Sequence, residues 1–141
     1  MFFLQALNSV SISGILNFDS YLTMLKTICY RSLITNEPSI LEIETLFNAC
    51  KKNNDNYNIK GLLYKYEGYY FQIIEGETET IDAIFSCIKT DKRHKNIDVL
   101  VDIPITEYTF DNFTTGYNKV NDLNTLLGHG TLAAQIKCLN R

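Results

Sequence analysis

One stretch of 19 residues restricts the fold of this chain more than any other. The run IKGLLYKYEGYYFQIIEGE, residues 59–77, is rich in β-branched and aromatic residues and is interrupted by Glu67 and Gly68. Such a run predicts two strands joined by a tight turn. Apolar residues occupy both faces of the second strand, so its side chains are not expected to face water.

Helical and strand periodicities flank this hairpin in a regular order. A strand is predicted at residues 22–30, and a helix follows in which Ser39 and Glu42 have capping-box spacing. That helix should end in the polar run 51–58, because Asn and Asp favour turns. Two strand-like runs, 97–105 and 106–120, come later, and a weak helical pattern begins at Asn121. The helical stripes consist of Ile40, Ile43, Leu46, Phe47 and Cys50 in the first helix and Ile81, Ile84, Phe85 and Ile88 in the second.

The order of these elements predicts an α+β protein. Strand, helix, strand, strand, helix, strand is the ferredoxin-like βαββαβ pattern, with two helices on one face of a mostly antiparallel sheet and a fifth strand added. We expect an N-terminal extension at 1–23, one domain at 24–118 and a short C-terminal helical tail at 119–141. Met24 is an alternative start of the natural chain, in which case residues 1–23 are only an upstream extension.

Composition excludes several classes of function. The 141 residues carry a net charge of −3, and their basic residues are mostly scattered, so neither nucleic acid nor an anionic membrane is an expected partner. The N-terminal residues have neither the basic start of a signal peptide nor the unbroken apolar run of a membrane span. Four widely separated cysteines without a C-x-x-C pair argue against a metal site and for a reduced, cytoplasmic protein. Motifs of hydrolases and transferases are absent from the sequence, and we assign Glu75-Gly76-Glu77 to the start of the second helix, without a catalytic role.

Gln72 is the residue that fits least well into a plain apolar core. Alternation places it on one face of its strand with Tyr70 and Ile74. A buried carboxamide needs hydrogen-bond partners, which local backbone groups could supply. The alternative is that Tyr30, Asn54 and Gln72 converge on a planar polar ligand such as a flavin, a pterin or a nucleobase. Taken singly, a partly buried tyrosine and an Asn-Asn pair at a helix end also have ordinary structural explanations.

Several segments together resemble the BLUF family, the sensors of blue light using flavin. In order, they are MLKTICYRS, KKNN, IKGLLY, YYFQIIEGE and DKRH, between Met24 and about Tyr117. The resemblance implies that Tyr30 is the redox-active tyrosine and Gln72 the switching glutamine. It further implies cofactor-binding roles for Asn53 and Asn54 at the flavin ring, for Asp91 and His94 near the ribityl chain, and for Ile43, Leu46 and Ile88 as apolar walls.

The implied function is a non-enzymatic photoreceptor that binds FAD, FMN or riboflavin. Light would move an electron and a proton from Tyr30 to the flavin and leave Gln72 rotated or tautomerised, with the signal passing to a protein partner or a homo-oligomer. Two alternatives are a degenerate interaction module without flavin and a dark flavin-dependent oxidoreductase. The chain departs from the family pattern at Phe113 and Thr115, where Trp and Met are frequent, at Asn58-Ile59-Lys60-Gly61 in place of G-[IV]-T-G, and at Cys87 in place of an arginine.

Overall fold

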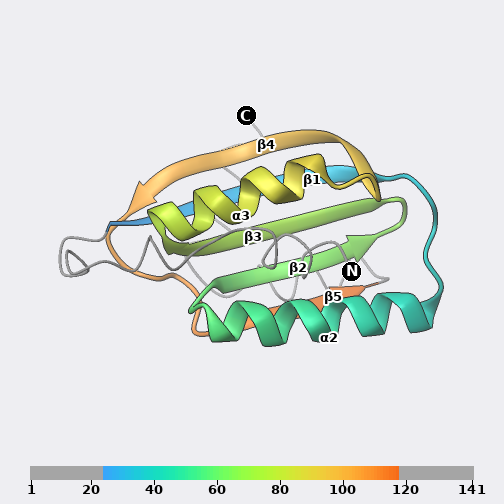
Figure 1. Ribbon diagram of the computed structural model, residues 1–141, viewed down its shortest axis with the longest axis horizontal. Helices are drawn as coiled ribbons and strands as arrows, with labels where there is room; N and C mark the ends of the chain where they lie inside the picture. Colours follow the sequence, from blue (N-terminus) through green and yellow to red (C-terminus); the bar gives the residue numbers. More distant parts are fainter. Residues whose placement is uncertain (1–23, 118–141) are drawn as a thin grey trace.

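The computed structural model describes residues 24–117, which form a sheet covered on one face by two helices (Figure 1). The predicted α+β class and the order of its elements are confirmed. The strands are β1 (Leu25–Ile34), β2 (Lys60–Tyr66), β3 (Tyr69–Glu77), β4 (His94–Ile105) and β5 (Phe113–Tyr117), and the helices are α2 (Ile40–Asn56) and α3 (Thr78–Thr90).

The strand order is β4-β1-β3-β2-β5, so β3 lies at the centre of the sheet. It pairs antiparallel with β1 and β2, and β1 pairs antiparallel with β4. The first four strands therefore have the ferredoxin-like arrangement that the sequence predicts. The added strand β5 runs parallel to β2 at the edge. In the β1–β3 register Tyr30 lies directly opposite Gln72, which places both side chains on the same face of the sheet.

Helix α2 begins and ends as predicted. The Ser39 hydroxyl accepts a hydrogen bond from the Glu42 amide, and the Glu42 carboxylate accepts one from the Ser39 amide, each at 3.1 Å. At the other end the helix extends to Asn56 through most of the polar run 51–58. An ion pair between Lys51 and Asp55, 3.2 Å long and one helical turn apart, supports this last stretch.

The connection from α2 to β2 explains one departure from the family pattern. Asn58 has a φ of 57°, which lies in the left-handed region where the family pattern has glycine. Asparagine is the residue after glycine that enters this region most readily, so the departure is compatible with the same backbone. Gly61 has no such substitute, because its φ is 138° and an added Cβ would lie 2.0 Å from the Ile73 carbonyl oxygen.

Apolar side chains are buried on both faces of the sheet, which explains why β3 shows little polar alternation. Ile74 of β3 belongs to the core cluster under the helices, whereas Ile73 belongs to a second cluster on the opposite face with Leu62 and Tyr64. Of the cysteines predicted on helix faces, Cys50 is fully buried and Cys87 is partly exposed.

The bounds of three strands differ from the prediction. β4 begins at His94 rather than at residue 97. β1 starts at Leu25 and continues to Ile34 rather than ending at Tyr30, because its later residues pair with both β3 and β4. β5 comprises only Phe113–Tyr117, since residues 106–112 form a loop. The predicted extension at 1–23 and helical tail at 119–141 lie outside the described residues.

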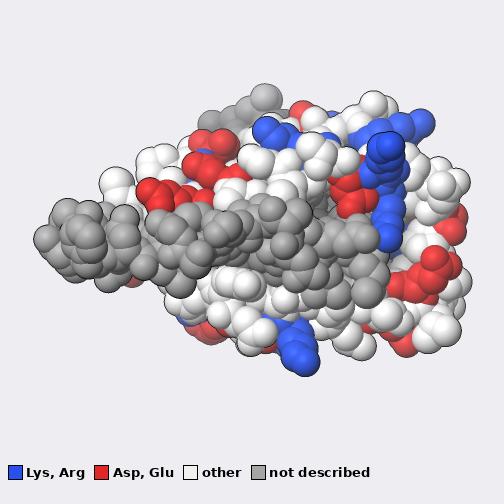
Figure 2. All heavy atoms as spheres, in the orientation of Figure 1, with Lys and Arg blue, Asp and Glu red and all other residues white. Residues whose placement is uncertain are grey.

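The surface of the described part carries charges of both signs. On the face shown in Figure 2, acidic and basic side chains both occur, and neither kind forms one continuous patch. Within residues 24–117, neither α2 nor α3 has the length and apolar character needed to cross a bilayer.

Candidate functional site

Tyr30 and Gln72 form a buried hydrogen-bonded pair under the helices. The Tyr30 hydroxyl donates to Gln72 Oε1 at 2.5 Å, and the two residues are 0% and 1% exposed. Burial raises the pKa of Tyr30 well above its ordinary value, so the phenol keeps its proton at neutral pH. The carboxamide in the apolar strand therefore has a side-chain partner 42 residues away in the sequence, on a different strand.

The orientation of the Gln72 amide follows from this bond. A hydroxyl donor requires the carbonyl end of the carboxamide, and the planar group then directs its Nε2 amino group away from Tyr30. One end of Gln72 is thus bound to the phenol, and the other end can donate to a different group. This two-ended arrangement allows a change on one side of the amide to alter the hydrogen bond on its other side.

Aromatic rings hold Tyr30 from two sides. Its ring centroid lies 5.5 Å from that of Phe85 and 6.2 Å from that of His94. His94 Nε2 donates to the Ile88 carbonyl oxygen at 2.7 Å, since a carbonyl can only accept. In a neutral ring the other nitrogen, Nδ1, then accepts from the Ser32 hydroxyl, also at 2.7 Å. These two bonds fix the histidine ring beside Tyr30.

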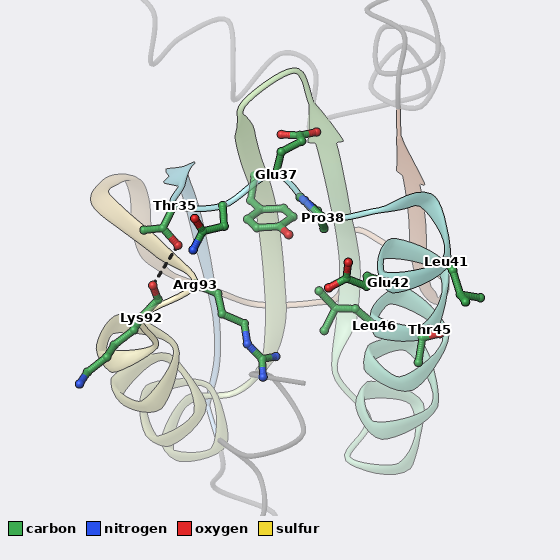
Figure 3. Close-up of a pocket in the computed structure, with 11 residues that line it drawn as sticks. Thr35, Glu37, Pro38, Leu41, Glu42, Thr45, Leu46, Lys92 and Arg93 are labelled. Atoms are coloured by element: carbon green, nitrogen blue, oxygen red, sulfur yellow. Dashed lines mark hydrogen bonds between the residues drawn. The ribbon is translucent and has the colours of Figure 1, made fainter.

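A pocket of about 600 Å³ opens between the two helices (Figure 3). Its volume falls within the range of small-molecule sites. Leu46 from α2 and Tyr70 from β3 contribute to its lining, and the Arg93 side chain extends into the space between the helices. The rim is polar and includes Glu37 and Glu42. The lining thus combines apolar and aromatic side chains with a larger number of polar and charged residues, which can bind an organic ligand that carries polar groups.

The predicted apolar walls lie in one region of the core. Leu46 lines the pocket, while Ile43 and Ile88 are buried in the same core cluster as Tyr30. Asn54 is 4% exposed, and its backbone carbonyl accepts from the Ile59 amide at 2.8 Å, which joins the end of α2 to the start of β2.

The side chains of the other two predicted cofactor-binding residues, Asn53 and Asp91, form hydrogen bonds with backbone groups nearby in the sequence. The Asn53 side chain donates to the Ala49 carbonyl oxygen of its own helix at 3.1 Å. Asp91 Oδ1 accepts from the Arg93 amide at 2.9 Å and so orders the turn between α3 and β4. The cofactor-binding roles of these residues stay predictions.

The sequence interpretation missed two residues of this region and one on the opposite face of the sheet. Tyr70 and Arg93 line the pocket, and both had a signal, because Tyr70 shares the face of Gln72 and Arg93 lies within the DKRH segment. Glu75 is fully buried at the end of β3 rather than at the start of a helix. Its carboxylate accepts three hydrogen bonds from Thr109 and Phe110 in the β4–β5 loop. Its place beside isoleucines in a strand was the available signal.

The donor set fits a flavin. A phenol and two carboxamides, those of Tyr30, Gln72 and Asn54, can both donate and accept, as the imide edge of an isoalloxazine requires. The structure joins Tyr30 and Gln72 by a hydrogen bond, and Tyr70, two residues before Gln72 on β3, lines the pocket, whereas Tyr30, Gln72 and Asn54 are not among the residues that line it. Within residues 24–117, the His, Cys, Asp and Glu side chains form no group of three that could hold a metal ion.

Comparison with known proteins identifies the family. Residues 25–116 match the BLUF family, described as sensors of blue-light using FAD, and the chain therefore belongs to it. A blue light- and temperature-regulated antirepressor of Escherichia coli K12 is 32% identical over 74 residues, which are 52% of this chain and 18% of that protein. A photoactivated adenylate cyclase subunit alpha of Euglena gracilis is 28% identical over 86 residues, or 61% of this chain and 8% of the relative. The chain thus spans less than a fifth of these curated relatives.

Solved structures of similar size also match. The dark-state structure of the BLUF protein BlrB has a TM-score of 0.66 at 25% identity, and the match covers 83% of this chain and 95% of that one. The photo-activated state of BlsA has a TM-score of 0.65 at 26% identity, covering 82% and 91% of the two chains. These matches agree with the fold described above.

Proposed function

We propose that this chain senses blue light through a flavin bound non-covalently between α2 and α3, with Tyr30 and Gln72 as its photoactive residues. The buried hydrogen bond from the Tyr30 hydroxyl to Gln72 Oε1 is the observation that carries this proposal. Asn54 and Asn53 would hold the polar edge of the ring, Ile43, Leu46 and Ile88 its faces, and Asp91 and His94 the neighbourhood of the ribityl chain. Residues 24–118 would form the light-sensing domain.

Tyr30 is the residue suited to give up an electron. A flavin that has absorbed blue light is a strong oxidant, able to take an electron from a neutral phenol. Burial raises the pKa of Tyr30, so the phenol would still hold its proton when it is oxidised. An oxidised phenol is far more acidic than a neutral one, and its proton would therefore move along the hydrogen bond towards Gln72 Oε1.

Gln72 is the residue suited to keep a changed conformation or tautomer after the electron and the proton have returned. When the electron and the proton return to Tyr30, the carboxamide is left rotated or tautomerised, with its donor and acceptor ends exchanged. Nothing is consumed in this cycle. The altered hydrogen bond is a local change on the central strand β3, and it can bias the elements packed against that strand.

The identity of the flavin and of the partners belongs to the same proposal. FAD, FMN and riboflavin all carry the ring to which these residues are directed. We propose that the signal passes to a protein partner or to a second copy of the chain. Three free cysteines among the described residues, two of them buried, support a site of action in the reducing cytoplasm.

Absorption spectroscopy tests the proposal. The protein reconstituted with a flavin should show a red-shifted flavin band after blue light and recover in the dark. Tyr30→Phe should bind flavin without this photocycle, and Gln72→Leu should lose the normal shift, whereas Tyr69→Phe, at an exposed position of β3, should behave as the wild type. A full red shift in Tyr30→Phe would refute the mechanism, and a protein that stays colourless with flavin would favour the degenerate interaction module.

A further inference from the structure

Tyr70 lies on the sheet next to the Tyr30–Gln72 pair. It stands two residues before Gln72 in β3, so both side chains project from the face that the helices cover. In the β1–β3 register Tyr70 lies opposite Ser32, as Gln72 lies opposite Tyr30. Tyr70 is 3% exposed and belongs to the same core cluster as Tyr30. One face of the sheet thus carries two buried phenols at neighbouring positions.

The surroundings of the two phenols differ. Tyr30 is enclosed by rings and by Gln72, whereas Tyr70 lines the pocket between the helices. Burial and the nearby Glu37 carboxylate raise the pKa of Tyr70 to about 12. The hydroxyl is therefore protonated at neutral pH and can both donate and accept in the pocket.

The pocket around Tyr70 has groups that suit hydroxyls better than an apolar ring. The Glu42 carboxylate and the Leu46 side chain extend from α2 towards the space into which Arg93 reaches from the other side (Figure 3). Glu37 and Thr45 add a further carboxylate and a hydroxyl to the lining. Carboxylates accept from hydroxyl donors, and a guanidinium donates to hydroxyl or phosphate oxygens.

We propose that the Tyr70 hydroxyl hydrogen-bonds the hydroxylated side chain of the flavin and so makes the site selective for flavins that carry such a chain. The inference rests on the proposed function, because it needs a flavin in this pocket. It assigns to Tyr70 a contact with the side chain of the flavin, whereas the proposed function directs Tyr30 and Gln72 to the ring. Riboflavin, FMN and FAD would be favoured over lumiflavin, which has the same ring with only a methyl group at that position.

A comparison of two ligands and two variants tests this inference. The full chain, freed of flavin, is titrated with riboflavin and with lumiflavin, and the dissociation constants are measured by quenching of flavin fluorescence. Tyr70→Phe should weaken riboflavin binding about fivefold, as expected for one net neutral hydrogen bond, and leave lumiflavin binding unchanged. Tyr69→Phe removes a phenol hydroxyl from the adjacent residue, which is 49% exposed on the opposite face of β3, and should change neither constant.

The other outcomes of this titration distinguish a failure of the Tyr70 inference from a failure of the proposed function. Unchanged riboflavin binding in Tyr70→Phe would overturn the inference while leaving the proposed function intact. An equal loss for both ligands would also overturn it, because Tyr70 would then act on the ring or on the shape of the pocket. Retained lumiflavin binding shows in the same titration that the variant is folded. If the wild-type chain binds neither ligand, the proposed function fails, and this inference fails with it.

Discussion

The carboxylate of Glu75 should make a measurable contribution to the stability of the fold. Glu75 is fully buried on β3, and it accepts hydrogen bonds from the Thr109 amide at 2.6 Å, the Thr109 hydroxyl at 2.7 Å and the Phe110 amide at 2.8 Å. These bonds attach the β4–β5 loop, residues 106–112, to the central strand. Replacing Glu75 by alanine removes all three bonds at once.

The expected loss follows from the number and the kind of these bonds. A hydrogen bond to a charged acceptor contributes about 1.5–3 kcal/mol, which sets an upper limit of several kcal/mol for three. Thr109 is exposed, so a freed amide can bind water and recover part of that amount. We therefore expect Glu75→Ala to lower the free energy of unfolding by about 2–3 kcal/mol. Glu75→Gln keeps one carbonyl acceptor and should cost about 1 kcal/mol.

Urea unfolding of the wild type and the variants, followed by circular dichroism, measures these differences. Glu77→Ala is the matched control, because Glu77 lies on the same strand, is partly exposed and makes no side-chain bond at the start of α3; it should change stability by about 0.5 kcal/mol at most. Hydrogen exchange of the Thr109 and Phe110 amides should accelerate in Glu75→Ala. Equal stabilities of Glu75→Ala and Glu77→Ala, with unchanged exchange, would refute the reasoning.

Two further substitutions test local features of the fold. Gly61→Ala should lower the free energy of unfolding by about 3 kcal/mol or more, because Gly61 has a φ of 138° and an added Cβ would lie 2.0 Å from the Ile73 carbonyl oxygen. Gly68→Ala is the control in the same urea titration, since a Cβ at Gly68 meets nothing within 4 Å. A similar loss in both glycine variants would show that the backbone at Gly61 is not the cause. Ser39→Ala removes the hydroxyl that accepts from the Glu42 amide and should cost about 1 kcal/mol, measured in the same way, whereas an unchanged stability would contradict the capping box.

Local sequence patterns predicted most of the elements and part of the site. The alternation of β3 placed Tyr70, Gln72 and Ile74 on one face, and the structure confirms that all three are buried there. The capping box of Ser39 and Glu42 correctly located the start of α2. These features depend on side chains only a few residues apart, and that is why the sequence by itself determined them.

The tertiary structure decided the features that depend on pairing between distant segments. Gln72 meets Tyr30 because of the register of β1 against β3, two strands that no short turn connects. In the same way, Glu75 gained its partners only when the β4–β5 loop folded against the end of β3, and Arg93 reached the pocket through the turn after α3. Alternation determines which face a side chain occupies, but register and loop placement result from the burial and hydrogen bonding of the whole domain. The sequence by itself therefore determined that Gln72 is buried, and only the tertiary structure decided that its partner is a tyrosine.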